Sequence, residues 1–104
     1  MNREIEGRFL KIFTAGEMAR LSFTDKDGQL LITADVHGLT CRQAKRFLKN
    51  IILLVRKAFT LVVVHGYVHG TAIKRMILGT PINKRIISKS GLAWNYGVTL
   101  LECA

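Results

Sequence analysis

The stretch that decides the fold reads QLLITADVHGLTCRQAKRFLKNIILLVRKAFTLVVVH and covers residues 29–65. Its first part, Gln29–Val36, predicts a strand, and its last part, Phe59–His65, predicts another. The last part is an uninterrupted apolar run that ends in a histidine, which is typical of a strand covered on both faces. A helix between two such strands makes a β-α-β unit, so we expect parallel pairing and a right-handed crossover.

The segment between these strands, residues 40–55, predicts an amphipathic helix. It starts with TCRQ, a capping box in which the Thr40 hydroxyl can accept from a free backbone amide and Gln43 can reach back. Apolar residues then recur at steps of three and four, which predicts one buried stripe: Ala44, Phe47, Leu48, Ile51, Ile52 and Val55. Basic residues share another face, within an arc of about 100°: Arg42, Lys45, Arg46, Lys49 and Arg56. This cationic face can bind a polyanion, or it can be an ordinary solvated surface.

The segments on either side predict further strands and a second helix. Ala19–Phe23 and the turn residues Asp25–Gly28 predict a hairpin over residues 19–36. Residues 1–18 have approximately helical apolar spacing interrupted by glycines, so a helix and an irregular arm are both open. After the unit, Thr71 can cap a short second helix. The remaining expected elements are that helix over 72–78, strands over 85–88 and 97–102, and a polar, aromatic loop over 89–96.

The chain has the size of one domain and a strong excess of positive charge. Its 104 residues include 16 Lys and Arg against 7 Asp and Glu, a formal net charge of +9. Such a domain attracts polyanions, nucleic acid first and an anionic membrane surface second, although the same charge can simply keep a small protein dispersed. We expect residues 1–29 to form an N-terminal extension or hairpin strand and residues 30–104 to form the main α/β domain.

The sequence favours the cytoplasm and gives no sign of a zinc site or a membrane span. Cys41 and Cys103 are the two cysteines, and neither lies in a CxxC or CxxH spacing. The charged N-terminus lacks the apolar core of a signal peptide, and no apolar run approaches the roughly 18 residues of a membrane span. We therefore expect a reduced cytoplasmic protein with two unpaired thiols and no membrane partner, and its oligomeric state stays open.

Three titratable side chains are expected at one edge of the sheet. Asp35 and His37 lie two residues apart at the carboxyl end of the first strand, and His65 ends the second. Because the carboxyl ends of parallel neighbours share an edge, where open α/β sheets usually bind ligands, the three are candidate catalytic residues. Each also has an ordinary explanation: Asp35 can cap the following turn, and His37 can be a tolerated loop residue.

A glycine-containing loop opens onto the same edge and predicts a phosphate site. The loop GYVHG, residues 66–70, allows close backbone approach, and the amides that start the next helix can donate to a phosphate. Such a loop is also common wherever a chain turns tightly. The expected phosphate- and nucleic-acid-binding residues are Gly66, His69, Gly70, Thr71, Lys74 and Arg75, together with Arg42, Lys45, Arg46 and Lys49 of the cationic face.

Two separated segments match motifs of a known family. ADVHGLT, residues 34–40, resembles L-D-x-H-G-L-T, and VHG at 64–66, continued by TAIK at 71–74, resembles H-G-x-G followed by T-G-x-L-[RK]. With these motifs and the helix and strand between them, residues 30–103 resemble the Smr (small MutS-related) domain family. The chain departs from the family pattern at Ala34 in place of Leu, at Val68 in place of the second glycine in a longer loop, and at 89–97, where Trp94 and Tyr96 replace a glycine-rich stretch.

The resemblance implies a fold and an activity. The fold would be β-α-β-α-β-β, a four-stranded mixed sheet with two helices, similar to the C-terminal domain of bacterial translation initiation factor 3. Members of the family bind DNA or RNA, several are endonucleases, and some act on messenger RNA at stalled or collided ribosomes. By resemblance, Asp35 and His37 are the suspected catalytic groups, and His65, Gly66 and Gly70 serve substrate binding and activity.

These observations lead to three hypotheses. The first is an endonuclease in which His37 acts as acid or base, Asp35 orients it or binds a metal, and loop amides with Lys74 stabilise phosphoryl charge. RNA needs no metal, because a base can activate its 2′-hydroxyl, whereas DNA usually needs Mg²⁺ or Mn²⁺ to activate water. The second is a non-catalytic module for RNA, DNA or a ribosome, in which Trp94 and Tyr96 stack on bases or simply anchor the loop. The third is an adaptor for acidic proteins or an anionic membrane.

Overall fold

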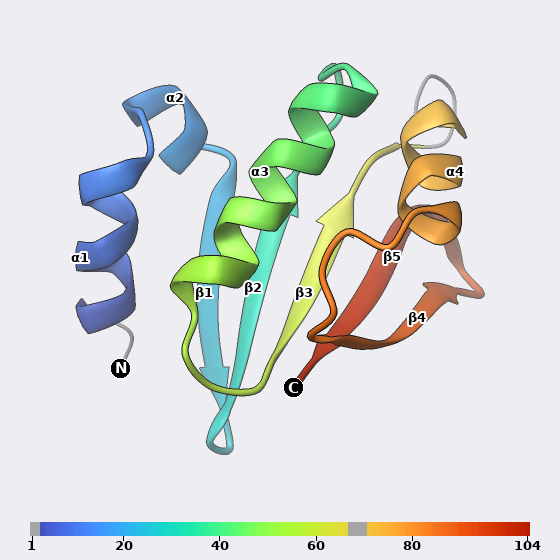
Figure 1. Cartoon of the computed structure of the whole chain (residues 1–104). Helices are drawn as coiled ribbons and strands as arrows, with labels where there is room; N and C mark the ends of the chain where they lie inside the picture. The colour runs from blue at the N-terminus through green and yellow to red at the C-terminus, as the bar shows by residue number, and fades with distance from the viewer. Residues whose placement is uncertain (1–2, 67–70) are drawn as a thin grey trace.

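The computed structural model describes residues 3–66 and 71–104, which form four helices and five strands (Figure 1). No helix in these ranges combines the length and apolarity needed to cross a bilayer. The α/β fold class expected from the sequence is confirmed. In chain order the elements are α1 (Arg3–Ile12), α2 (Ala15–Met18), β1 (Leu21–Lys26), β2 (Gln29–Asp35), α3 (Cys41–Leu54), β3 (Phe59–Val64), α4 (Thr71–Gly79), β4 (Ile86–Leu92) and β5 (Asn95–Cys103).

The strands form one mixed sheet in the order β1-β2-β3-β5-β4. β2 and β3 are parallel, with Asp35 opposite Val64, and the other neighbouring pairs are antiparallel. The predicted β-α-β unit with parallel strands is therefore confirmed. The sheet has five strands rather than four because β1 pairs with β2 along its whole length, starting with Leu21 opposite Ala34.

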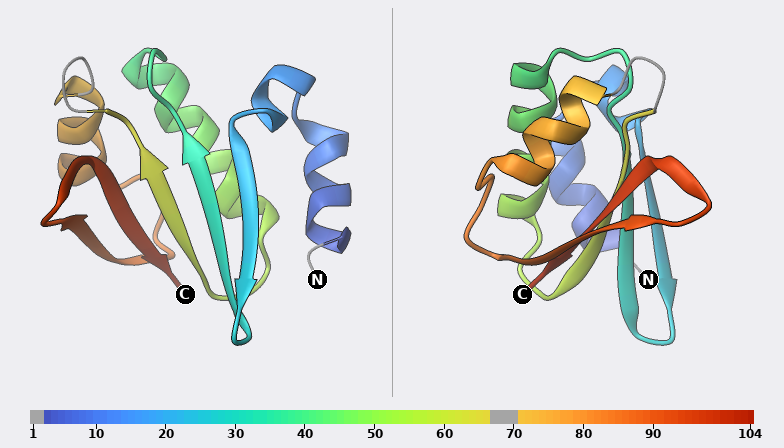
Figure 2. Two further views of the ribbon diagram at one scale, coloured as in Figure 1. Left: turned by 180° about the vertical axis from the view of Figure 1, so that it is seen from behind. Right: turned by 90° about the vertical axis from the view of Figure 1, so that its right-hand side faces the viewer.

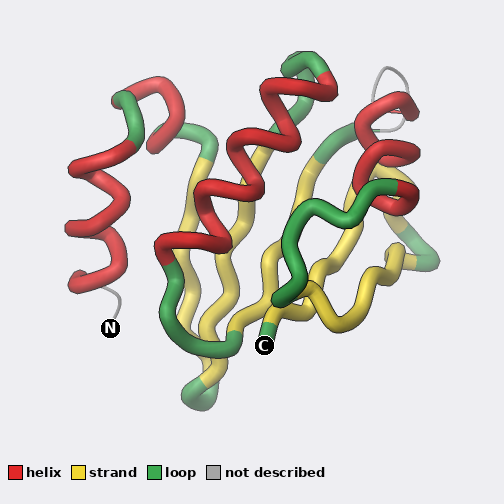
Figure 3. Tube along the Cα trace, viewed as in Figure 1, coloured by secondary structure: helices red, strands yellow, loops and turns green. Residues whose placement is uncertain are grey.

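All the described helices lie on one face of the sheet, as Figure 2 and Figure 3 show. On this side Ile32 and Leu61 are fully buried, in a core that also holds Phe9 of α1 and Ile51 of α3. On the other side, the open face, alternate residues of β3 remain half-buried. The expectation that residues 59–65 are covered on both faces is wrong, because none of the described helices packs on the open face.

The residues before β1 join the same core as a helix rather than as an irregular arm. Phe9 of α1 contacts Phe23 of β1 edge to face, with ring centroids 5.2 Å apart. Phe13 contacts Phe47 of α3 in the same way at 5.3 Å. Such pairs add about 0.5–1.5 kcal/mol each beyond the area that they bury, so the N-terminal helix is anchored to both the sheet and α3.

The helix α3 begins and packs as its sequence predicts. Thr40 Oγ1 accepts from the Gln43 amide at 3.1 Å, and Gln43 Oε1 accepts from the Thr40 amide at 3.0 Å. The predicted apolar stripe is buried throughout: Ala44, Phe47, Leu48, Ile51, Ile52 and Val55. Because the stripe faces the sheet, the cationic face is left on the exposed side of the helix.

The β4–β5 hairpin corrects one expectation from the sequence. In place of a loop over residues 89–96, only Ala93 and Trp94 form a turn, and the residues on either side continue the strands. Polar residues fit here because β4 lies at the edge of the sheet. Lys89 also has a structural partner: its Nζ atom donates to the Ile77 and Thr80 carbonyls at 2.8 and 3.0 Å and so caps the carboxyl end of α4.

Candidate functional site

The carboxyl ends of β2 and β3 form a rim that also holds the first turns of α3 and α4 (Figure 1). Asp35 and Val64 are the last residues of the two strands and lie opposite each other in the sheet. Because both strands run the same way, the chain leaves the sheet twice at this rim, once into α3 and once towards α4. The rim is therefore the edge at which the sequence predicts the candidate residues.

Asp35 and His37 form a hydrogen-bonded pair on the rim. Asp35 Oδ1 accepts from the His37 amide at 3.1 Å and from His37 Nδ1. A carboxylate only accepts, so the proton lies on Nδ1 and, in the neutral ring, Nε2 keeps its lone pair. The His37 side chain is 67% exposed and that of Asp35 37%, and Nε2 has no hydrogen-bond partner among the described residues. The pair thus presents a base of fixed orientation to solvent.

Arg20 fixes the backbone that carries this pair. Its Nη1 atom donates to the carbonyl oxygens of Asp35 and His37, both at 3.0 Å, and its own carbonyl accepts from the Asp35 amide at 2.8 Å. Gly38 then takes a φ of +80°, which turns the chain towards α3. Sequence reasoning missed Arg20. The hairpin register could have found it, because a two-residue turn after Lys26 places residue 20 opposite residue 35.

His65 lies at the same rim but faces the other side of the sheet. Side chains alternate along a strand, so His65 points to the helix side, whereas Val64 and its partner Asp35 point to the open face. The His65 residue is 1% exposed; Nδ1 donates to the Gly66 carbonyl at 2.8 Å and Nε2 accepts from the Thr99 hydroxyl at 2.9 Å. The expectation that three titratable groups meet is therefore corrected. Two of them meet, and His65 holds the strand end instead.

The start of the glycine-containing loop lies against β5. Gly66 has a φ of +75°, a value that favours glycine, and the His65 and Gly66 amides donate to the Gly97 carbonyl at 2.9 and 3.0 Å. A Cβ atom on Gly97 would lie 3.1 Å from Gly66 Cα, so this close approach favours glycine on β5 as well. Two of the expected phosphate-binding residues, His69 and Gly70, lie outside the described residues.

The expected cationic residues have two different settings. Those on α3 are all exposed and, in the described part of the chain, form no ion pair with a carboxylate: Arg42, Lys45, Arg46 and Lys49. On α4, Thr71 and Arg75 are exposed, whereas Lys74 is half-buried with its Nζ atom 5.9 Å from the centre of the Tyr96 ring. The cationic face starts with Arg42 in the first turn of α3, near the rim, and then follows the side of the helix that points away from the sheet, so its charge adds to the attraction of the domain for a polyanion.

The pair itself offers few ligands to a divalent ion. In the ranges 3–66 and 71–104, no group of three or more His, Cys, Asp or Glu side chains is arranged to hold a metal. Mg²⁺ can bind through a single carboxylate when substrate phosphates complete its shell. Both hydrogen bonds from His37 use Asp35 Oδ1, so the pair would offer such an ion one remaining carboxylate oxygen, Oδ2. The arrangement therefore fits acid–base chemistry better than metal binding.

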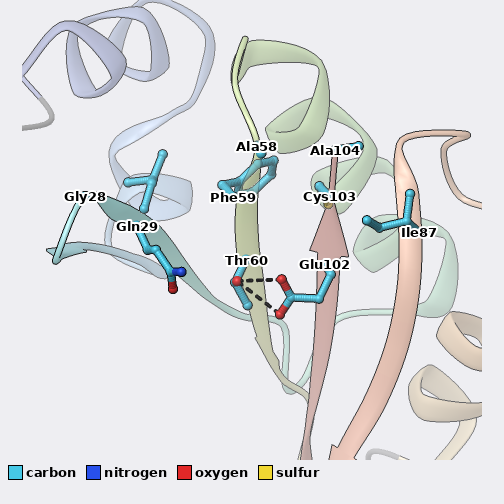
Figure 4. A pocket seen from close by; sticks show the side chains of 10 residues that line it. Gly28, Gln29, Ala58, Phe59, Thr60, Ile87, Glu102, Cys103 and Ala104 are labelled. Carbon is cyan, nitrogen blue, oxygen red and sulfur yellow. Dashed lines mark hydrogen bonds between the residues drawn. The ribbon is translucent and has the colours of Figure 1, made fainter.

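A hollow of about 410 Å³ lies at the opposite end of the sheet, beside the β1–β2 turn (Figure 4). Gln29, Phe59 and Ile87 contribute to its lining. Glu102 also lines it, and its two carboxylate oxygens accept from the Thr60 hydroxyl at 3.1 and 3.0 Å. A carboxylate repels phosphate groups, so this hollow does not suit a polyanion. The rim, and not the hollow, is the candidate site.

No protein-family model matches the chain, and no curated protein matches it. The resemblance to the two Smr motifs therefore stays a prediction that depends on residues 34–40 and 64–74. The first of these segments carries the exposed pair, and the second carries the buried His65 and the turn at Gly66.

Proposed function

We propose that the chain binds nucleic acid and cuts RNA as an endonuclease of the Smr type, with His37 as the general base and Asp35 as the group that orients it. The observation that carries this proposal is the exposed, hydrogen-bonded Asp35–His37 pair at the rim. A base with one nitrogen bound to a carboxylate and the other open to solvent is suited to activating a hydroxyl nucleophile. The formal charge of +9 supplies the attraction for the substrate.

In the proposed reaction, His37 Nε2 takes the proton from a ribose 2′-hydroxyl. The 2′-oxygen attacks the adjacent phosphorus, the bond from phosphorus to the 5′-oxygen breaks, and that oxygen takes a proton from water. His37 then returns its proton to solvent, and the products are a 2′,3′-cyclic phosphate and a 5′-hydroxyl. Positive charge from Lys74 and the start of α4 stabilises the negative charge that grows on the phosphoryl oxygens.

RNA fits this site better than DNA does. DNA lacks the 2′-hydroxyl, so its cleavage uses water as the nucleophile and usually requires a divalent ion to activate it. Asp35 is the single carboxylate of the pair, and His37 already occupies one of its oxygens. Oxygen ligands for Mg²⁺ are therefore scarce, whereas a base for a hydroxyl is at hand.

A non-catalytic module that binds RNA, DNA or a ribosome is the second candidate. The exposed cationic face of α3 favours it, because that face would hold a phosphate chain whether or not a bond is cut. The buried position of His65 favours it too, since one of the expected chemical groups is then removed from the substrate. The two candidates differ in a single property, which is turnover.

Digestion of a labelled RNA and of its 2′-deoxy analogue, both in EDTA, separates the candidates. The proposal predicts that only the RNA is cut, and that His37→Ala slows cutting by about 10²–10⁴ while RNA affinity is retained. Asp35→Asn should also lower turnover, whereas Asp25→Asn, the same change at an exposed position of β1, should not. Equal cutting of both substrates, or a fully active His37→Ala variant, would overturn the proposal. RNA binding without any cutting by the wild-type chain supports the binding module instead.

A further inference from the structure

Two large aromatic side chains of the β4–β5 hairpin are exposed. Trp94 is 82% exposed and Tyr96 is 68% exposed. Rings of this size usually bury most of their surface in a folded protein, because contact with water is unfavourable for them. The hairpin projects from the open face of the sheet (Figure 2). The hydrophobic core contains neither ring, so the packing of the fold does not explain them.

Tyr96 lies near the same rim as the proposed catalytic pair. Asp35, Val64 and Val98 are successive register partners across β2, β3 and β5, so this row spans two strand spacings, roughly 10 Å. One residue closer to the rim, the Gly97 carbonyl accepts hydrogen bonds from the chain that leaves β3. Tyr96 is the next residue of β5. A short stretch of nucleic acid can therefore contact the pair and the Tyr96 ring together.

A positive charge lies beside the Tyr96 ring. Lys74 Nζ, from α4, is 5.9 Å from the ring centre, a distance at which the ring attracts a cation. The backbone next to the ring is held as well, because Asn95 Oδ1 accepts from the Gly97 amide at 3.0 Å. A nucleotide combines a flat aromatic base with a negative phosphate. An exposed ring with a neighbouring ammonium group matches both parts.

We propose that Tyr96, together with Trp94 on the same hairpin, stacks on an unpaired base, so that the substrate is single-stranded RNA or an RNA loop. This inference rests on the proposed function in taking RNA as the ligand. In a duplex, neighbouring base pairs cover the faces of the bases, whereas in a single strand those faces are open to an aromatic side chain. The Lys74 ammonium group beside the ring then attracts a neighbouring phosphate, and the hairpin selects the unpaired state.

The single tryptophan of the chain, Trp94, reports directly on this stacking. The first probe is a short 2′-O-methyl uridine oligomer, which lacks the free 2′-hydroxyl that the proposed cleavage requires. The second is an abasic oligomer with the same number of phosphates. Stacking predicts that the uridine oligomer quenches Trp94 fluorescence and binds about five- to a hundredfold more tightly than the abasic one. Equal binding of the two, or binding without a change in Trp94 emission, would overturn the proposal.

Variants of the hairpin sharpen the test, with binding measured by the anisotropy of a labelled oligomer. Tyr96→Ala should lose most of the preference for the base-bearing oligomer, and Tyr96→Phe should keep it. Leu10→Ala, which removes an exposed apolar side chain from α1, is the matched control and should change nothing. A full preference in Tyr96→Ala would contradict the stacking role.

The two proposals fail in distinguishable ways because these assays cut no bond. Base-selective binding by a chain that cleaves no RNA supports the stacking site and removes the nuclease. Cleavage without base-selective binding supports the nuclease and removes the stacking site. A surface that serves a protein partner instead would give neither base preference nor quenching, and that outcome also counts against stacking.

Discussion

Each of the two parallel strands is followed by a histidine, and the two histidines have opposite environments. The His37 side chain, beyond β2, is 67% exposed and bonded to Asp35. His65, beyond β3, is 1% exposed, with its nitrogens bonded to Gly66 and Thr99. A place at the carboxyl end of a strand is therefore not enough to make a side chain available for chemistry. Whether the side chain is accessible depends on the face of the sheet to which it points, because helices cover one face and leave the other open (Figure 2).

The largest expected effect separates the two histidines by their contribution to stability. His65→Ala removes the partners of the Thr99 hydroxyl and the Gly66 carbonyl and opens a cavity, so the free energy of unfolding should fall by about 3 kcal/mol. His37→Ala, on an exposed ring, should change it by less than about 0.5 kcal/mol. Urea denaturation of both variants measures the difference. Similar losses for the two would show that burial does not distinguish them.

A second effect concerns the fixed turn that carries His37. Arg20→Ala removes the donor to the Asp35 and His37 carbonyls without changing either side chain, so kcat for RNA should fall about tenfold or more while KM changes little. Arg20→Lys keeps a charged donor and should restore part of the rate, which a loss of folding alone would not explain. An unchanged kcat in Arg20→Ala would mean that the turn keeps its shape without the guanidinium.

Local signals predict the helices and strands, whereas pairing across the sheet decides the site. The capping box at Thr40 and the apolar stripe of α3 act over a few residues, which is why the β-α-β unit is readable from sequence. The faces of Asp35 and His65 depend on how β2 pairs with β3, because Asp35 lies opposite Val64 and not opposite the histidine. The local sequence pattern predicts that Asp35 and His65 lie at one edge of the sheet, but it does not predict the face to which each side chain points.

Contacts between segments that are distant in the sequence explain most of the other differences between the sequence-based expectations and the structure. Lys89 looks like a loop residue by composition, but its pairing with Leu101 makes it part of an edge strand, and its Nζ atom donates to the end of α4. Arg20 is one basic residue among 16 until the hairpin register brings it beside Asp35. The apolar run at Phe59–Val64 predicts two covered faces, but valine also suits a strand whose second face has no helix packed on it.

A smaller effect is expected on the cationic face of α3, which should contribute to RNA affinity, whereas the Asp35–His37 pair should contribute to kcat. Lys45→Ala and Lys49→Ala each remove one exposed cation, so RNA affinity should fall and the slope of log affinity against log salt should shrink by about 0.7 for each phosphate of a single strand that is no longer neutralised. The kcat at saturating RNA should stay the same. Lys26→Ala, at the far end of β1, is the matched control and should leave the salt slope unchanged. Titrations at several salt concentrations measure these slopes, and a lower kcat would place α3 in the chemistry.

The smallest expected effect lies at the far end of the sheet. Burial raises the pKa of Cys103 to about 11; Arg85 acts to lower it and Glu102 to raise it. The folded chain therefore keeps this proton between pH 9.0 and about 11 while the unfolded chain loses it, so the free energy of unfolding falls as pH rises through that window. Cys103→Ala should flatten this fall in urea denaturation.

A thiol reagent should modify the half-buried Cys41 before Cys103, and equal rates would contradict the burial of Cys103.

The chemical ends of the cut RNA test the central claim most directly. If His37 Nε2 activates a 2′-hydroxyl, RNA digested in EDTA carries a 2′,3′-cyclic phosphate on one fragment and a 5′-hydroxyl on the other, and His37→Ala yields neither above background. Fragments that end in a 5′-phosphate, or cyclic ends formed equally well by His37→Ala, would contradict the account.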